Sequence, residues 1–254
     1  MRLIKTISAL AAGAAIAACA SAKVLPEPAP LVAPAEISSY ILLDRTGSMY
    51  NIWDEALASV NAFAESVGKD APDDTSGVDI KTSVTLAVFD HHNGFQFDVL
   101  RDKVESKDWT NVTNDEASPR GMTPLYDAIG RIIARAEADN PDRAVIVIMT
   151  DGLENASREV TKQGAKAALD RAQSRGWEVV FLGAEFASFS DADAVGVSSS
   201  RQMAIGQGRM QESMDMLGQK ARSYGKGAAP SMEFTPEERA VADEEGVKQR
   251  TGNQ

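Results

Sequence analysis

Apolar and polar residues alternate along the middle of the chain in a pattern that predicts strands and helices in turn. Short, nearly continuous apolar runs predict buried strands at 40–43, 82–89, 144–149 and 177–183. Apolar residues at helical spacing predict helices over 52–67, 125–136 and 157–175. Strands that alternate with helices are typical of an α/β fold with a doubly wound, mostly parallel sheet and helices on both faces.

Two further segments are assigned to strands. Phe95, Phe97 and Val99 alternate with polar residues after Asn93-Gly94, which predicts a tight turn and an antiparallel hairpin at an edge of the sheet. A shorter strand is expected near 194–197.

The C-terminal third is expected to add helices to the domain. Residues 201–229 are predicted to form a helical extension that packs on it, with an apolar face that includes Met203, Met210, Met214, Met216 and Leu217. Residues 230–254 are expected to be a charged, mobile tail with a short helix, because Thr235-Pro236-Glu237-Glu238 combines a cap, an N1 proline and a third-position glutamate.

The N-terminus has the features of a secretory signal peptide, predicted over residues 1–18: basic residues and then a short apolar run. The sequence Ile16-Ala17-Ala18-Cys19 resembles the bacterial lipobox, in which cleavage leaves Cys19 as a lipid-carrying N-terminus. Ordinary cleavage near residues 20–22 and an uncleaved anchor remain alternatives. Residues 19–36 are expected to form an extended linker, because four of the ten prolines lie in 23–36.

Composition excludes several classes of protein. The 254 residues carry 26 basic and 37 acidic side chains, a formal net charge of −11, which argues against binding to nucleic acid. A single cysteine rules out an intrachain disulfide and a Cys/His cluster for zinc or iron–sulfur.

Five oxygen-bearing side chains are predicted to share one site. Asp44, Thr46 and Ser48 follow the first strand, Thr123 precedes a helix, and Asp151 follows a later strand. In a doubly wound sheet these loops meet outside the carboxyl ends of the strands. Oxygen ligands without histidine or thiol suit Mg²⁺, Mn²⁺ or Ca²⁺. Of these we expect Mg²⁺. The competing interpretation is that the three hydroxyls merely cap helices.

Nearby polar residues are expected to have structural roles. Asp127 lies in the first turn of a predicted helix, where the helix dipole favours negative charge. Glu154 and Asn155 follow Asp151 closely enough to lie near the ion, but they are interpreted as the solvated start of the following helix.

On these residues the chain, over roughly 38–200, resembles the von Willebrand factor A domain with its metal-ion-dependent adhesion site. The family pattern is Asp-x-Ser-x-Ser, a threonine in a second loop and an aspartate after a later strand, and here Thr46 replaces the first serine. The resemblance implies such a domain over 37–200, a cation held by the five residues above, and a protein partner that donates a carboxylate to it. Together with Cys19, it implies a domain tethered to the bacterial cell envelope, at the outer membrane or periplasmic face of a Gram-negative cell.

Two other functions are kept beside this one. A Mg²⁺-dependent phosphatase of the haloacid-dehalogenase type would need an aspartate as general acid where Thr46 stands. Motifs for acyl transfer and nucleotide binding are absent from the sequence, so no enzymatic activity and no catalytic residue are expected. Alternatively, the domain is a structural scaffold in which the metal only rigidifies the loops.

Overall fold

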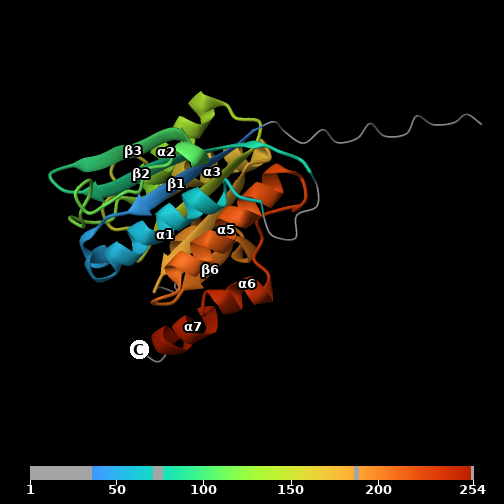
Figure 1. Ribbon diagram of the computed structural model, residues 1–254. Helices are drawn as coiled ribbons and strands as arrows, with labels where there is room; N and C mark the ends of the chain where they lie inside the picture. The colour runs from blue at the N-terminus through green and yellow to red at the C-terminus, as the bar shows by residue number, and fades with distance from the viewer. Residues whose placement is uncertain (1–35, 71–76, 186–188, 253–254) are drawn as a thin grey trace, which may run out of the picture. The chain divides into compact units, whose positions relative to one another are not determined.

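The computed structural model describes residues 36–70, 77–185 and 189–252, which form a six-stranded sheet covered by helices (Figure 1). The strands are β1 (Glu36–Asp44), β2 (Lys81–His91), β3 (Phe95–Glu105), β4 (Ala144–Thr150), β5 (Glu178–Ala184) and β6 (Gln202–Ile205). Their order across the sheet is β3-β2-β1-β4-β5-β6. The predicted signal peptide, Cys19 and the linker up to residue 35 lie outside the described residues.

The sheet is parallel except at β3. Strands β2, β1, β4, β5 and β6 pair in parallel, and β2 pairs with β3 in an antiparallel hairpin. The turn of this hairpin places Asn93 at φ 57° and Gly94 at φ 117°, in the left-handed region that asparagine and glycine adopt most readily. The predicted antiparallel hairpin at the sheet edge is therefore confirmed.

Helices cover both faces of the sheet. The helices are α1 (Trp53–Ser66), α2 (Leu125–Asp139), α3 (Lys162–Ser174), α4 (Ser190–Ala194), α5 (Met210–Gly225), α6 (Pro236–Val241) and α7 (Glu244–Gly252), with 3-10 turns η1 (Gly47–Ile52), η2 (Ser106–Asp108) and η3 (Ser199–Arg201). Figure 1 shows α1 and α5 side by side, and they contact each other along the sheet.

The hydrophobic core consists of two layers, one on each face. Phe63 of α1 and Leu217 of α5 belong to one layer, and Ile132 of α2 and Leu169 of α3 belong to the other. All seven residues of β4 are buried, and consecutive residues of β4 contribute to opposite layers. A continuous apolar run suits a central strand covered on both sides, so the predicted doubly wound α/β fold is confirmed.

Two element predictions for residues before 201 are wrong. Residues 194–197 are not a strand: α4 ends at 194, and the strand at this edge is β6. The helix expected from residue 157 begins at Lys162, where the Thr161 side chain caps the Gly164 N–H. Alanine-rich periodicity alone does not locate a helix start, because the cap decides it.

The C-terminal segment lies against the domain. Met210, Met214 and Leu217 of α5 are buried in the core, whereas Met203 belongs to β6 instead of a helix. The predicted start of α6 has a full capping box between Thr235 and Glu238. The side chains of this segment that are buried after α5 include Met232, Phe234, Ala242 and Val247. Over the described part of the chain, no helix is long and apolar enough to span a membrane.

Candidate functional site

Asp44 and Asp151 lie at the same edge of the sheet because their strands are neighbours. Asp44 is the last residue of β1, and Asp151 directly follows β4. These strands pair in parallel up to Leu43 and Met149, so both aspartates emerge at the carboxyl ends, where doubly wound folds bind ligands. Asp44 is fully buried and Asp151 is half-buried.

Three hydroxyl groups gather with the two carboxylates. The hydroxyl oxygens of Thr46 and Ser48 lie 3.1 Å apart, and Thr123 Oγ1 lies 3.4 Å from Thr46 Oγ1. The Ser48 hydroxyl donates a 2.7 Å hydrogen bond to Asp151 Oδ1, and the Thr46 N–H donates a 2.7 Å bond to Asp44 Oδ1. The five side chains that the sequence assigned to one site therefore form one connected cluster, which we call the oxygen cluster.

Helix capping does not explain these hydroxyls. Thr46 occupies the N-cap position of η1 but makes no capping hydrogen bond with its side chain. The N-cap position of α2 is Pro124, and no side-chain cap forms there either. Ser48 lies within η1. The hydroxyls face one another and a carboxylate instead, so the capping interpretation is wrong.

The carboxylate of Asp44 accepts hydrogen bonds from two donors and is buried away from water. Besides the Thr46 N–H, the Thr150 hydroxyl donates a 2.6 Å hydrogen bond to Asp44 Oδ2. Burial, with a smaller contribution from the charge of Asp151, raises the pKa of Asp44 to about 7. Burial also raises the pKa of Asp151. Both shifts mean that the ionised carboxylates are poorly stabilised by the protein groups around them.

In the described part of the chain, no basic side chain pairs with these carboxylates. Within residues 36–70, 77–185 and 189–252, neither Asp44 nor Asp151 forms an ion pair with a lysine or arginine. Arg45, although adjacent in sequence, pairs at 2.5 Å with Asp90 and at 2.5 Å with Asp98. The cluster therefore has two buried or half-buried carboxylates without a positive partner among the residues that the structure describes.

The three loops of the oxygen cluster are tied to one another through their backbones. The Gly47 N–H donates to the Gly121 carbonyl at 3.2 Å. Thr123 and Asn155 form a reciprocal pair, in which the Thr123 N–H donates to Asn155 Oδ1 at 2.9 Å and the Asn155 N–H donates to the Thr123 carbonyl at 3.0 Å. Gly121 has φ 72°, and a Cβ there would lie 2.4 Å from the His91 carbonyl oxygen. Only glycine fits this approach.

The segment that follows Asp151 is a loop held by two carboxylates, and it does not start a helix as the sequence suggested. Glu154 accepts hydrogen bonds from the N–H groups of Ala156 and Ser157 and from the Tyr126 N–H. Asp127, 1% exposed, accepts the N–H groups of Arg158, Glu159 and Val160 at 2.9, 2.9 and 2.6 Å. Asp127 therefore anchors this loop, a role beyond the dipole effect expected for it.

Sequence reasoning missed Thr150 and the true role of Asn155. Thr150 precedes Asp151 at the end of an apolar strand, and the pairing of β1 with β4 is what brings it to Asp44. Asn155 is close to Asp151 in the sequence, but its contact with Thr123 crosses 32 positions. Neither contact has a local sequence signal.

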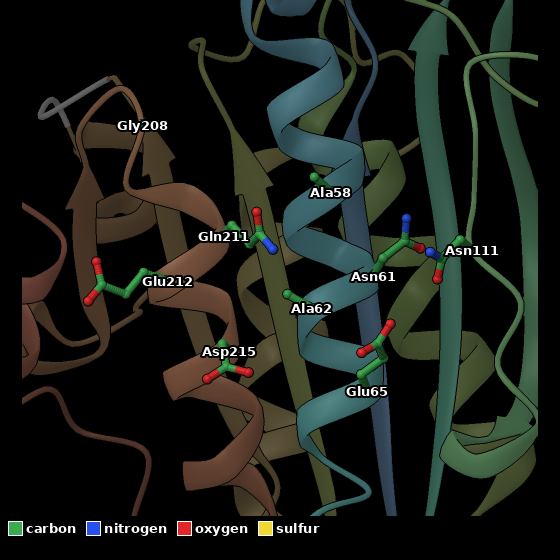
Figure 2. Close-up of a pocket in the computed structure, with 9 residues that line it drawn as sticks. All are labelled: Ala58, Asn61, Ala62, Glu65, Asn111, Gly208, Gln211, Glu212 and Asp215. Atoms are coloured by element: carbon green, nitrogen blue, oxygen red, sulfur yellow. The ribbon is translucent and has the colours of Figure 1, made fainter.

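A separate groove of about 610 Å³ lies between α1 and α5 (Figure 2). It is lined by small, amide and acidic residues: Ala58, Asn61, Ala62, Glu65, Asn111, Gly208, Gln211, Glu212 and Asp215. None of the oxygen cluster lines this groove. Among the described residues no three His, Cys, Asp or Glu side chains gather as a metal site, as expected for a donor set with only two carboxylates.

Comparisons with known proteins identify the fold. No protein-family model and no curated protein sequence matches the chain. Among solved structures, the vWF domain of the type V pili tip protein Mfa5 from Porphyromonas gingivalis aligns with a TM-score of 0.55 and 12% identity, over 73% of this chain and 95% of that chain.

Two longer proteins align in the same way. The pilus adhesin SpaC from Lactobacillus rhamnosus GG gives a TM-score of 0.55 at 12% identity, over 76% of this chain and 30% of that chain. Proximal thread matrix protein 1 from the mussel byssus gives 0.50 at 14% identity, over 75% and 47%. The chain thus matches less than half the length of these two proteins. The chain has the fold of the von Willebrand factor A domain.

Proposed function

We propose that the oxygen cluster binds a divalent cation and that the domain binds a protein partner through it. The observation that carries this proposal is the convergence of five side-chain oxygens from three loops, with hydroxyl–hydroxyl distances of 3.1 and 3.4 Å and a 2.7 Å hydroxyl–carboxylate bond. Asp44, Thr46, Ser48, Thr123 and Asp151 would hold the cation, directly or through water.

The chemistry of the donor set fits a hard divalent cation. Burying two carboxylates without a positive partner is unfavourable, and the raised pKa values of Asp44 and Asp151 reflect that cost. A divalent charge would offset it. Hydroxyl and carboxylate oxygens suit Mg²⁺, Mn²⁺ and Ca²⁺, and of these we propose Mg²⁺.

The composition of the cluster also supports binding of a partner through the cation. Two carboxylates and three hydroxyls leave room in an octahedral shell for water or an outside ligand. A carboxylate from a partner protein would suit that position. The pilus adhesin and the pili tip protein share this fold, which supports an adhesive role without naming a partner.

We further propose that the domain is tethered to the bacterial cell envelope through a lipid on Cys19. The support is the signal-peptide pattern and the lipobox-like Ile16–Cys19 in the sequence. Metabolic labelling with radioactive palmitate tests this: wild type should incorporate label and Cys19→Ala should not. Equal labelling of both proteins would contradict the anchor.

A structural scaffold is the second candidate. The reciprocal Thr123–Asn155 pair and the Gly47–Gly121 hydrogen bond already connect the loops. In a scaffold, the bound cation would rigidify these loops further and would not contact the partner. Asp151→Ala separates the two functions. Loss of both metal and partner binding supports the bridge, whereas loss of metal with partner binding retained supports the scaffold. In either case we propose a binding protein and no enzyme.

Calorimetric titration of Mg²⁺ into EDTA-treated full-length protein tests the site. We expect one-to-one binding in the wild type and a loss of affinity of about tenfold or more in Ser48→Ala, because one oxygen ligand is removed. Ser199→Ala is the matched control, since Ser199 is exposed and outside the cluster. Equal affinity in Ser48→Ala and Ser199→Ala would contradict the proposal.

A further inference from the structure

Large hydrophobic side chains are exposed next to the oxygen cluster. Among the described residues four such side chains are exposed: Tyr50 at 76%, Met122 at 48%, Leu153 at 44% and Val99 at 37%. Three of them lie within two positions of a cluster residue, one on each loop, because Tyr50 follows Ser48, Met122 precedes Thr123 and Leu153 follows Asp151. Scattered exposed hydrophobic residues need no explanation, but their gathering at one site does.

The loops that carry these side chains are fixed close together. Residues two positions apart have Cα atoms within about 7 Å, so each of the three side chains starts beside the cluster. Met122 is held by a backbone pair with His91, with N···O distances of 2.9 and 3.3 Å. A Cβ on Gly152 would lie 3.6 Å from Thr123 Oγ1 and 3.8 Å from Ser48 Oγ, which places the third loop against the first two.

We propose that Tyr50, Met122 and Leu153 form an apolar rim around the cation site and select a protein partner that presents a carboxylate flanked by apolar side chains. This inference rests on the proposed function. The cation alone would accept any accessible carboxylate. The apolar rim would bind more tightly to a carboxylate whose neighbouring side chains are apolar and can pack against Tyr50, Met122 and Leu153.

The charge balance of the site explains why such a rim would matter. Asp44 and Asp151 together neutralise a divalent cation, so in water the site attracts a further carboxylate only weakly. Apolar side chains that close over the contact exclude water and strengthen the electrostatic interaction inside. A central polar contact surrounded by apolar contacts is also the usual arrangement at binding hot spots.

Peptides of defined sequence test this selectivity at the metal itself. The full-length protein is loaded with Mn²⁺, and the paramagnetic relaxation of peptide protons is measured. The peptides are capped Gly-Leu-Glu-Leu-Gly, Gly-Ser-Glu-Ser-Gly and Gly-Leu-Gln-Leu-Gly. The first should bind about tenfold more tightly than the second, the gain expected from partial burial of two leucines. The glutamine peptide should show no binding, because it lacks the carboxylate.

Rim variants complete the test. The triple variant Tyr50→Ser, Met122→Ser, Leu153→Ser should bind Mn²⁺ as wild type does but lose the preference for leucine. Val99→Ser, which changes the exposed hydrophobic residue away from the site, should keep it. Tyr50→Ser alone should reduce the preference for the leucine peptide. This single variant keeps the test valid if the triple variant does not fold.

The outcomes separate this inference from the proposed function. Equal binding of both glutamate peptides to Mn²⁺-loaded wild type overturns the rim and leaves the metal site intact. Failure of wild type to bind Mn²⁺ overturns the proposed function first. A Mn²⁺-dependent dimer that the triple variant abolishes would show that a second copy of the chain covers the rim, which also overturns the inference.

Discussion

Asp127→Asn is expected to destabilise the domain by about 3 kcal/mol. Asp127 Oδ1 accepts two backbone N–H groups, from Glu159 and Val160, and Oδ2 accepts one from Arg158. An asparagine has the same shape but can keep the two bonds to Oδ1 only as neutral hydrogen bonds, about 1 kcal/mol weaker each. Its NH₂ group would then face the Arg158 N–H, leaving a buried donor unpaired at a cost of about 1 kcal/mol or more.

Thermal and urea unfolding measure this cost. For a domain of this size about 3 kcal/mol corresponds to a decrease in Tm of about 10 °C. Asp142→Asn is the matched control, because Asp142 is exposed in the connection between α2 and β4. A change below about 0.5 kcal/mol in Asp127→Asn, or a gain in stability, would refute the conclusion that this carboxylate holds the 158–160 loop.

Three further predictions concern the loops and the helix layer. Gly121→Ala should lower the Tm more than Gly94→Ala in thermal unfolding, since both have positive φ but only at Gly121 would the Cβ meet a backbone oxygen, at 2.4 Å. Gly218→Ala should lower the free energy of unfolding in urea by about 1–3 kcal/mol, because its Cβ would lie 2.7 Å from a backbone oxygen of α1. An unchanged urea midpoint would contradict the close packing of α1 against α5. In EDTA, Asp44→Asn should stabilise the protein more at pH 8 than at pH 5. The folded-state pKa of Asp44, about 7, exceeds the ordinary value of 3.8, so the ionised carboxylate that prevails above pH 7 destabilises the fold. An equal effect of the substitution at both pH values would contradict this.

The fold could be predicted because its signals are local. The apolar run of β4 and the helical spacing of α1 each lie within one segment of sequence, and the Asn93-Gly94 turn identifies the hairpin. The errors arose where tertiary contacts decide. The loop from Gly152 to Thr161 resembles the start of a helix, but Asp127 and Glu154 bind its N–H groups in another conformation.

The five predicted site residues could be grouped because strand order places their loops at one edge of the sheet. Their supporting contacts could not be found in the same way. The Thr150–Asp44 hydrogen bond and the Thr123–Asn155 pair join positions 106 and 32 residues apart. The exposure of Tyr50, beside a cluster in which Asp44, Thr46 and Thr123 are buried, likewise depends on how η1 lies on the domain.

Anomalous diffraction from crystals of the protein soaked in Mn²⁺ is the most direct test of the cation site. We predict one strong anomalous peak among the side-chain oxygens of Asp44, Thr46, Ser48, Thr123 and Asp151, and its absence from crystals of Asp44→Ala. A peak located elsewhere, or a wild-type crystal in which the five oxygens hold no manganese at saturating concentration, would contradict the account.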